Sequence, residues 1–138
     1  MIELKDINKI FNALGTVNTV SIFYDEVMEL KVKTATEQIC RRVLELDDRL
    51  SVFKAASEIS QINAEAGKNF VQVSTDTYHI ICTAVKYAKL SGGAFDITTR
   101  PLSKLWGIGK KGNFIPSESE IKEAKDLVNY RDIICDDK

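Results

Sequence analysis

The sequence predicts an α+β fold in which a mixed or antiparallel sheet opens with a hairpin and packs against helices. Near the N-terminus, β-branched and aromatic residues alternate over a stretch that is typical of a strand. Later stretches carry apolar residues every three or four positions, as amphipathic helices do. The opening hairpin and the uneven spacing of the strand-like stretches favour a mixed layer over a doubly wound parallel sheet.

The hairpin is expected in the first quarter of the chain. Over Phe11–Asp25 both alternating faces hold apolar residues, which indicates a strand covered on both sides. Gly15 interrupts its beginning and indicates a bend or a close approach to the backbone. Asp25 and Glu26 are expected to turn the chain into a second, antiparallel strand over Val27–Lys33.

A helix is expected next, because Thr34–Glu37 has a capping-box pattern. It ends near Leu50, and one face carries an apolar stripe made of Ile39, Val43, Leu46 and Leu50. The neighbouring acids Asp47 and Asp48 point in different directions on a helix. We therefore expect them to be solvated rather than to form a metal-binding pair.

The middle of the chain predicts two more helices and a short strand. After a connector over residues 51–56, Ser57 can cap a short helix. A strand over Phe70–Val73 follows, and Ser74 then caps a longer helix. That helix ends at Ser91–Gly93, because glycine readily leaves a helix through a left-handed residue.

The last third of the chain has a less regular pattern. In residues 94–114, Pro101 and three glycines break any long element. A helix start follows at Pro116–Glu120, and apolar residues recur on one face of that helix. Residues 131–135 are predicted to form a strand. Because the chain stops directly after this strand, we expect the natural protein to continue.

Length and charge exclude some classes of function. The 138 residues are 44% apolar and 28% charged, which is ordinary for a globular domain with its own core. The 19 basic and 20 acidic side chains nearly cancel. Since nucleic-acid-binding proteins usually present a basic face, we expect no nucleic-acid partner.

The N-terminus lacks the pattern of an export signal. Charged residues interrupt the apolar ones over residues 1–12, whereas a signal peptide needs an unbroken apolar stretch. No apolar run is long enough for a transmembrane helix. The sequence as written predicts a cytoplasmic protein, or an exported one if an N-terminal segment has been removed.

The potential metal ligands are scattered. Cys40, Cys82 and Cys135 are far apart in sequence and have no C-x-x-C spacing, so free buried thiols are expected. The single histidine, His79, cannot form a histidine-rich site and is expected to be a surface or packing residue. We predict no metal ligand set within this chain.

The segment Gly92–Thr98 is the strongest candidate for chemistry. Its two glycines allow a ligand to come close, Phe95 can pack on a planar ring, and Asp96 can accept hydrogen bonds from ligand N–H or O–H groups. The structural alternative is a glycine helix stop with a buried Phe95 and an Asp96 that caps its own turn. The residues by themselves leave both interpretations open.

Four segments, taken together, resemble the ApbE family of FAD:protein FMN transferases. They occur in the family's order and at about its spacing. They are Leu14–Thr16, Leu50–Phe53 with Ser57–Asn63, Gly92–Thr98 with Pro101–Leu102, and Leu105–Gly109 with Pro116 and Ile121.

The resemblance implies that FAD lies against this part of the protein. It assigns the flavin contacts to Leu14, Phe53, Ala94, Phe95 and Asp96. Leu14 stands where the family usually has Met, a swap that nearly conserves volume. Phe53 stands where Tyr is usual, so an aromatic face is kept and a hydroxyl contact is lost.

The resemblance also implies a reaction in which FMN is moved from FAD onto a threonine of an acceptor protein, with release of AMP. In the family this reaction depends on Mg²⁺, whose ligands lie in the second half. Residues 1–138 would then be the N-terminal, flavin-facing portion, with the C-terminal metal-binding half absent. We expect this portion alone to be inactive and to self-associate through the surface that the missing half would cover.

Two other functions are weighed against the transferase. One is a flavin-binding module that binds FAD without transferring FMN. The other is an interaction domain in which Gly92–Asp96 is purely structural and flavin does not bind.

Overall fold

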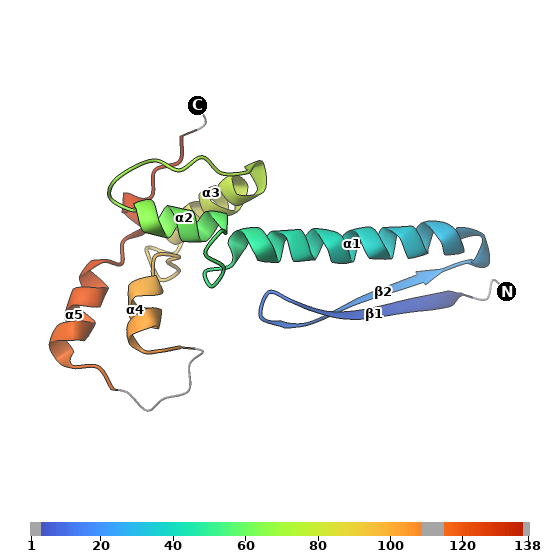
Figure 1. Ribbon diagram of the computed structural model, residues 1–138, viewed down its shortest axis with the longest axis horizontal. Helices are drawn as coiled ribbons and strands as arrows, with labels where there is room; N and C mark the ends of the chain where they lie inside the picture. Colours follow the sequence, from blue (N-terminus) through green and yellow to red (C-terminus); the bar gives the residue numbers. More distant parts are fainter. Residues whose placement is uncertain (1–3, 109–114, 137–138) are drawn as a thin grey trace. The chain divides into compact units, whose positions relative to one another are not determined.

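The computed structural model describes residues 4–108 and 115–136. The chain divides into two compact units, residues 1–73 and residues 74–138. The first unit holds a hairpin and two helices, and the second holds three helices with the connecting turns (Figure 1). The predicted α+β class, with a hairpin packed against helices, is confirmed.

The hairpin lies earlier in the chain than predicted. Strand β1 (Lys5–Ala13) pairs antiparallel with β2 (Thr16–Tyr24), in a register that runs from Lys5 opposite Tyr24 to Ala13 opposite Thr16. The turn is therefore Leu14-Gly15, at φ angles of 55° and 72°. Two successive positive φ angles are what a two-residue type I′ hairpin turn requires.

The predicted second strand over Val27–Lys33 is wrong, because these residues are helical. A 3-10 turn over Glu26–Met28 leads directly into helix α1 (Glu29–Leu50). The alternation of Met28, Leu30 and Val32 with charged residues mimics a strand. The helix forms instead because Val32 begins its buried face, and lengthening an existing helix needs no new nucleus.

Helix α1 packs against both strands of the hairpin through one stripe (Figure 1). The stripe contains the buried residues Val32, Thr36 and Cys40, spaced four apart. The predicted cap at Thr34 is wrong: Thr34 lies inside the helix, and its hydroxyl donates to the Leu30 carbonyl at 3.0 Å. Ile39 lies off the stripe and is exposed.

The rest of the first unit follows the prediction except for one strand. Helix α2 (Glu58–Glu65) begins at Ser57, whose hydroxyl accepts the Ser60 N–H at 3.0 Å. The predicted strand over Phe70–Val73 is wrong. In the part of the chain that the structure describes, the sheet consists of β1 and β2, and these residues have no strand to pair with.

The second unit is built around helix α3 (Thr75–Leu90). Ser74 caps its start as predicted, and Thr77, Val85 and Ala88 form its buried face. It ends where the Gly93 N–H donates back to the Ala88 carbonyl at 2.9 Å. This bond is the usual closure of a helix through a left-handed glycine, which here is Gly92 at a φ of 62°.

Two further helices and a 3-10 turn complete the second unit. Helix α4 (Arg100–Leu105) was not predicted; Pro101 lies in its first turn, where its missing N–H is no loss. Helix α5 (Glu118–Asp126) begins at Ser117, within the predicted helix start, and buries Ala124. The predicted strand over residues 131–135 is wrong, because the chain forms a 3-10 turn over Tyr130–Asp132 that Asn129 caps.

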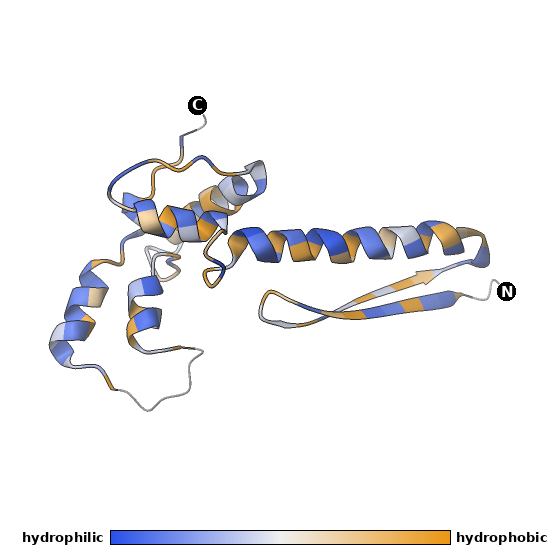
Figure 2. Ribbon diagram, viewed as in Figure 1, coloured by the Kyte–Doolittle hydropathy of each residue, from blue (hydrophilic) through white to orange (hydrophobic). Residues whose placement is uncertain are grey.

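Each unit has a small core and much apolar surface. The buried apolar residues are Ala13, Val32, Cys40, Val85, Ala88, Ala124 and Tyr130. Orange, hydrophobic positions recur along β1, β2 and α1 in Figure 2. Phe23 on β2 is 73% exposed, and Val27 in the 3-10 turn is 92% exposed. None of the helices in the described residues is both long enough and apolar enough to cross a bilayer.

The capping box of α5 predicts a measurable loss of stability. Ser117 accepts the Glu120 N–H, and the Glu120 carboxylate accepts the Ser117 N–H at 2.8 Å. We expect Ser117→Ala to destabilise the protein by about 1 kcal/mol, measured by urea unfolding with far-ultraviolet circular dichroism. Glu123→Ala, at an exposed position of the same helix outside the capping box, should leave the unfolding midpoint almost unchanged.

Candidate functional site

The turn after α3 is organised by the carboxylate of Asp96. One oxygen, Oδ1, accepts the Thr98 N–H at 2.7 Å and the Thr98 hydroxyl at 2.6 Å. The other oxygen, Oδ2, accepts the Tyr130 N–H at 2.9 Å. The Thr98 hydroxyl oxygen in turn accepts the Asn129 N–H at 2.9 Å. Two segments more than 30 residues apart in sequence are thus joined around one charge.

These contacts keep Asp96 ionised. Partial burial raises the pKa of the Asp96 carboxyl, but the hydrogen bonds from the Thr98 side chain, the Thr98 N–H and the Tyr130 N–H outweigh it, so the pKa lies below its ordinary value. Because folding lowers the pKa of Asp96, its ionised carboxylate stabilises the folded protein fully at pH values above the pKa of the unfolded state. This stabilisation is lost as the pH falls through the pKa of the folded state.

The neighbouring candidates lie on an exposed edge of this turn. Ala94 and Phe95 are both exposed, and the Phe95 N–H donates to the Ser91 hydroxyl at 3.0 Å. Phe95 is 48% exposed, so the expectation of a buried Phe95 under the structural alternative is wrong. Together with His79, Tyr87 and other α3 residues, this ring lines a shallow apolar depression of about 650 Å³.

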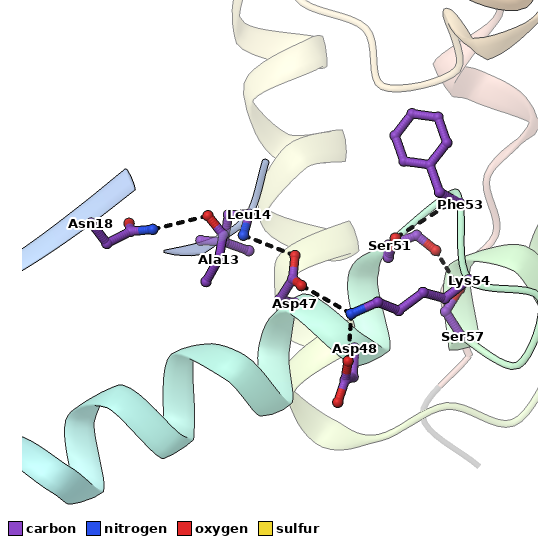
Figure 3. Close-up of polar contacts among 9 residues, drawn as sticks. All are labelled: Ala13, Leu14, Asn18, Asp47, Asp48, Ser51, Phe53, Lys54 and Ser57. Atoms are coloured by element: carbon purple, nitrogen blue, oxygen red, sulfur yellow. Dashed lines mark hydrogen bonds and ion pairs between the residues drawn. The ribbon is translucent and has the colours of Figure 1, made fainter. Parts of the chain in front are cut away.

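Leu14 lies at the tip of the hairpin, in a conformation that is uncommon for its residue type. Its φ is 55°, which places a side chain with a Cβ in the left-handed region. Its N–H donates to Asp47 Oδ1 on α1 at 2.9 Å (Figure 3), and the residue is 53% exposed.

Phe53 lies in the connector between α1 and α2, within the same unit. Its N–H donates to the Ser51 hydroxyl at 3.2 Å, and the residue is 82% exposed. The Ser51 carbonyl accepts the hydroxyl of the buried Ser57 at 2.5 Å, which ties the connector to the start of α2. The connector is therefore ordered by hydrogen bonds while the aromatic ring is presented outward (Figure 3).

The structure thus groups the five predicted residues by unit. Ala94, Phe95 and Asp96 form one turn in the second unit, and Leu14 and Phe53 belong to the first. Sequence reasoning missed Asp47 and Lys54, whose ion pair lies between the hairpin tip and the connector (Figure 3). It also missed Asn129 and Tyr130, which offer backbone N–H groups that no side-chain motif reveals.

The cysteines only partly match the prediction. All three are free, as expected, but only Cys40 is buried, and Cys135 is exposed. Partial burial and the adjacent Cys82 thiol raise the pKa of Cys135 to about 11, which makes it a poor nucleophile at neutral pH. Across residues 4–108 and 115–136, no group of three or more His, Cys, Asp or Glu side chains could hold a metal ion.

The fold matches solved structures of ApbE proteins. The structure superposes on the crystal structure of an ApbE protein from Thermotoga maritima with a TM-score of 0.80 and 30% identity, covering 96% of this chain and 42% of that one. It also matches the flavin transferase ApbE from Vibrio cholerae, with a TM-score of 0.80 and 24% identity over 94% of this chain and 42% of that one.

Sequence comparison extends this result. The ApbE family profile matches residues 14–138. The FAD:protein FMN transferase of Klebsiella pneumoniae (strain 342) is 31% identical over 112 residues, 78% of this chain and 35% of the relative. That of Escherichia coli (strain K12) is 33% identical over 100 residues, 70% of this chain and 27% of the relative. The chain belongs to the ApbE family and spans about a third of the length of these curated relatives.

The Asp96 contacts predict how the turn responds to substitution and to pH. In Asp96→Asn, an amide N–H₂ must face either Tyr130 N–H or the two Thr98 donors, so at least one donor is left unpaired. We expect a loss of about 1–3 kcal/mol of unfolding free energy near pH 7, measured by urea titration. The difference in unfolding free energy between wild type and Asp96→Asn should become smaller below about pH 4, because Asp96 is then protonated in wild type. Asp132→Asn is the control on the same segment; an equal loss in both variants would contradict the assigned role.

Proposed function

We propose that this chain is the flavin-facing part of an FAD:protein FMN transferase. The observation that carries the proposal is the match of residues 14–138 to the ApbE family, together with relatives of that name at 31–33% identity. The local geometry supports it, because each predicted flavin contact lies on an ordered turn and four of the five are well exposed.

The proposed reaction is the transfer of FMN from FAD to a threonine hydroxyl of an acceptor protein. The hydroxyl oxygen forms a bond to the phosphorus of the FMN moiety, and the bond from that phosphorus to the bridging pyrophosphate oxygen breaks. AMP leaves with the bridging oxygen, and the hydroxyl proton passes to a base or to water. No redox change accompanies this substitution.

In this proposal the aromatic rings of Phe53 and Phe95 pack against planar parts of FAD, and Leu14 adds an apolar contact. Asp96 can still accept a hydrogen bond from the ligand. A carboxylate offers about four acceptor sites, and the Thr98 and Tyr130 donors use three of them. Asp96 would therefore hold the turn and contact the ligand at the same time.

Mg²⁺ is part of the proposed activity of the intact protein. Such an ion lowers the repulsion of the pyrophosphate charges during transfer. Within the residues that the structure describes there is no cluster able to hold it. The side chains of this chain are accordingly assigned to binding and orienting FAD, and none of them to a catalytic step.

The first test is a titration of the full-length gene product with FAD, followed by flavin fluorescence. Phe53→Ala should weaken binding about three- to tenfold, as expected for the loss of one aromatic contact. Phe70→Ala is the matched control, since Phe70 is a 74% exposed ring in the same unit that the proposal leaves without a role. AMP release with an acceptor protein present should require Mg²⁺.

The outcomes separate the alternatives. FAD binding without AMP release at any Mg²⁺ concentration would identify a non-catalytic flavin-binding module. An absence of FAD binding would leave an interaction domain in which Gly92–Asp96 is structural. Equal effects of the Phe53 and Phe70 substitutions would remove Phe53 from the site.

We also propose that the 138-residue chain self-associates. Ile10, Val17 and Phe23 are exposed apolar residues on the hairpin, each more than 60% accessible. In the described residues β1 and β2 pair only with each other, so each strand has one edge of unpaired backbone groups. Apolar side chains beside an open edge favour strand-to-strand association.

Multi-angle light scattering of the 138-residue chain tests this. The average mass should rise above that of the monomer as concentration increases. Phe23→Lys should shift the mass toward the monomer, whereas Leu127→Lys, at a 68% exposed position of the second unit, should not. A monomer at all concentrations would contradict the proposal.

A further inference from the structure

We infer that Asp47, held by Lys54, is a positioning residue that fixes both the Leu14 turn and the Phe53 connector for flavin binding. The inference rests on the proposed function and deepens it. It assigns a role to Asp47, which the sequence pattern predicts only to be solvated beside Asp48, and to Lys54, for which the sequence predicts no role.

The first step is the unusual conformation of Leu14. Left-handed backbone is unfavourable for a residue with a Cβ, and type I′ turns therefore favour Asn, Asp or Gly at this position. Here a leucine occupies it at a φ of 55°, with its side chain 53% exposed rather than packed in a core. Such strain persists only where the surroundings hold it, and it concentrates at binding sites.

The second step concerns the hydrogen bonds that hold the Leu14 turn in this conformation. Asp47 Oδ1 accepts the Leu14 N–H at 2.9 Å across 33 residues of sequence. On the other side of the turn, the Asn18 side-chain amide donates to the carbonyl oxygens of Ala13 and Thr16 at 2.9 and 3.2 Å. The turn is thus fixed from helix α1 through Asp47 and from within the hairpin through Asn18 (Figure 3).

The third step connects this turn to the Phe53 connector. Asp47 Oδ2 pairs with Lys54 Nζ at 3.0 Å, and Lys54 is the residue directly after Phe53. Lys54 also pairs with Asp48, so one ammonium group bridges two successive carboxylates. A single carboxylate therefore contacts the backbone of one candidate flavin residue and the chain neighbour of the other (Figure 3).

The two carboxylates are not equivalent. The Asp47 side chain is 24% exposed and contacts the hairpin, whereas the Asp48 side chain is 71% exposed and contacts Lys54. Hydrogen bonding from Lys54 and then from the Leu14 N–H holds the pKa of Asp47 below its ordinary value. The contacts therefore persist at neutral pH and weaken only as pH falls through that lowered value.

Four variants of the full-length gene product test the inference. We expect Asp47→Ala to raise the Kd for FAD about tenfold and Lys54→Met about three- to fivefold, in line with the loss of charge-assisted contacts. Asp47→Asn keeps an acceptor for Leu14 but loses the ion pair, and should lie between wild type and Asp47→Ala. Asp48→Asn is the matched control and should change the Kd less than about twofold.

Amide hydrogen exchange, measured without flavin, accompanies the FAD titration. Amide hydrogen exchange at residue 14 should become faster in Asp47→Ala and remain near wild type in Asp47→Asn and Asp48→Asn. Glycine adopts positive φ without strain. In a Leu14→Gly background, Asp47→Ala should therefore speed amide hydrogen exchange at residue 14 less than it does in wild type. The exchange rates of strand amides remote from the turn should stay unchanged in every variant, which shows that the hairpin is folded.

The outcomes separate this inference from the proposed function. Faster exchange at Leu14 with an unchanged Kd for FAD would overturn the positioning role while leaving the transferase proposal intact. Unchanged exchange at Leu14 in Asp47→Ala would overturn the inference whatever the Kd does. If wild type shows no FAD binding, both the proposed function and the role in flavin binding fail, and a change in exchange would then support only a structural contact.

Discussion

Aspartate carboxylates that accept backbone N–H groups from distant residues hold the loops on which the proposed flavin contacts lie. In the first unit, Asp47 accepts the Leu14 N–H across 33 residues, and in the second, Asp96 accepts the Tyr130 N–H across 34. Each carboxylate is also paired or hydrogen-bonded through its other oxygen. Charge-assisted bonds of this kind order a loop without covering it, which leaves neighbouring side chains open to a ligand.

This arrangement suits a chain whose cores are small. The buried apolar residues are mostly alanines and valines, while phenylalanines such as Phe23, Phe53 and Phe70 are largely exposed. Hydrophobic burial within each unit therefore contributes less than in a domain that buries its large side chains. The exposed apolar surface favours further contacts, with ligand for Phe53 in our proposal and with another copy for the hairpin.

The fold class and most helices could be predicted from local patterns, and the three wrongly predicted strands have one physical cause. Ser57 and Ser74 cap helices as predicted, and α5 begins within the predicted helix start over 116–120, because a helix start depends on residues within one turn. The strands over 27–33, 70–73 and 131–135 were predicted wrongly, since a strand exists only where another strand pairs with it. Short apolar runs do not reveal whether such a partner is available.

The sequence by itself determined the caps at Ser57 and Ser74 and the glycine stop after α3, and its resemblance to the ApbE family supplied the residues that face flavin in our proposal. Only the tertiary structure decided that Asp47 and Asp48 have different partners and that Asp96 accepts the Tyr130 N–H. It also decided that Leu14, rather than Asp25, makes the hairpin turn. Caps depend on neighbours along the chain, whereas the Asp47–Leu14 and Asp96–Tyr130 contacts join residues more than 30 positions apart, and folding alone brings them together.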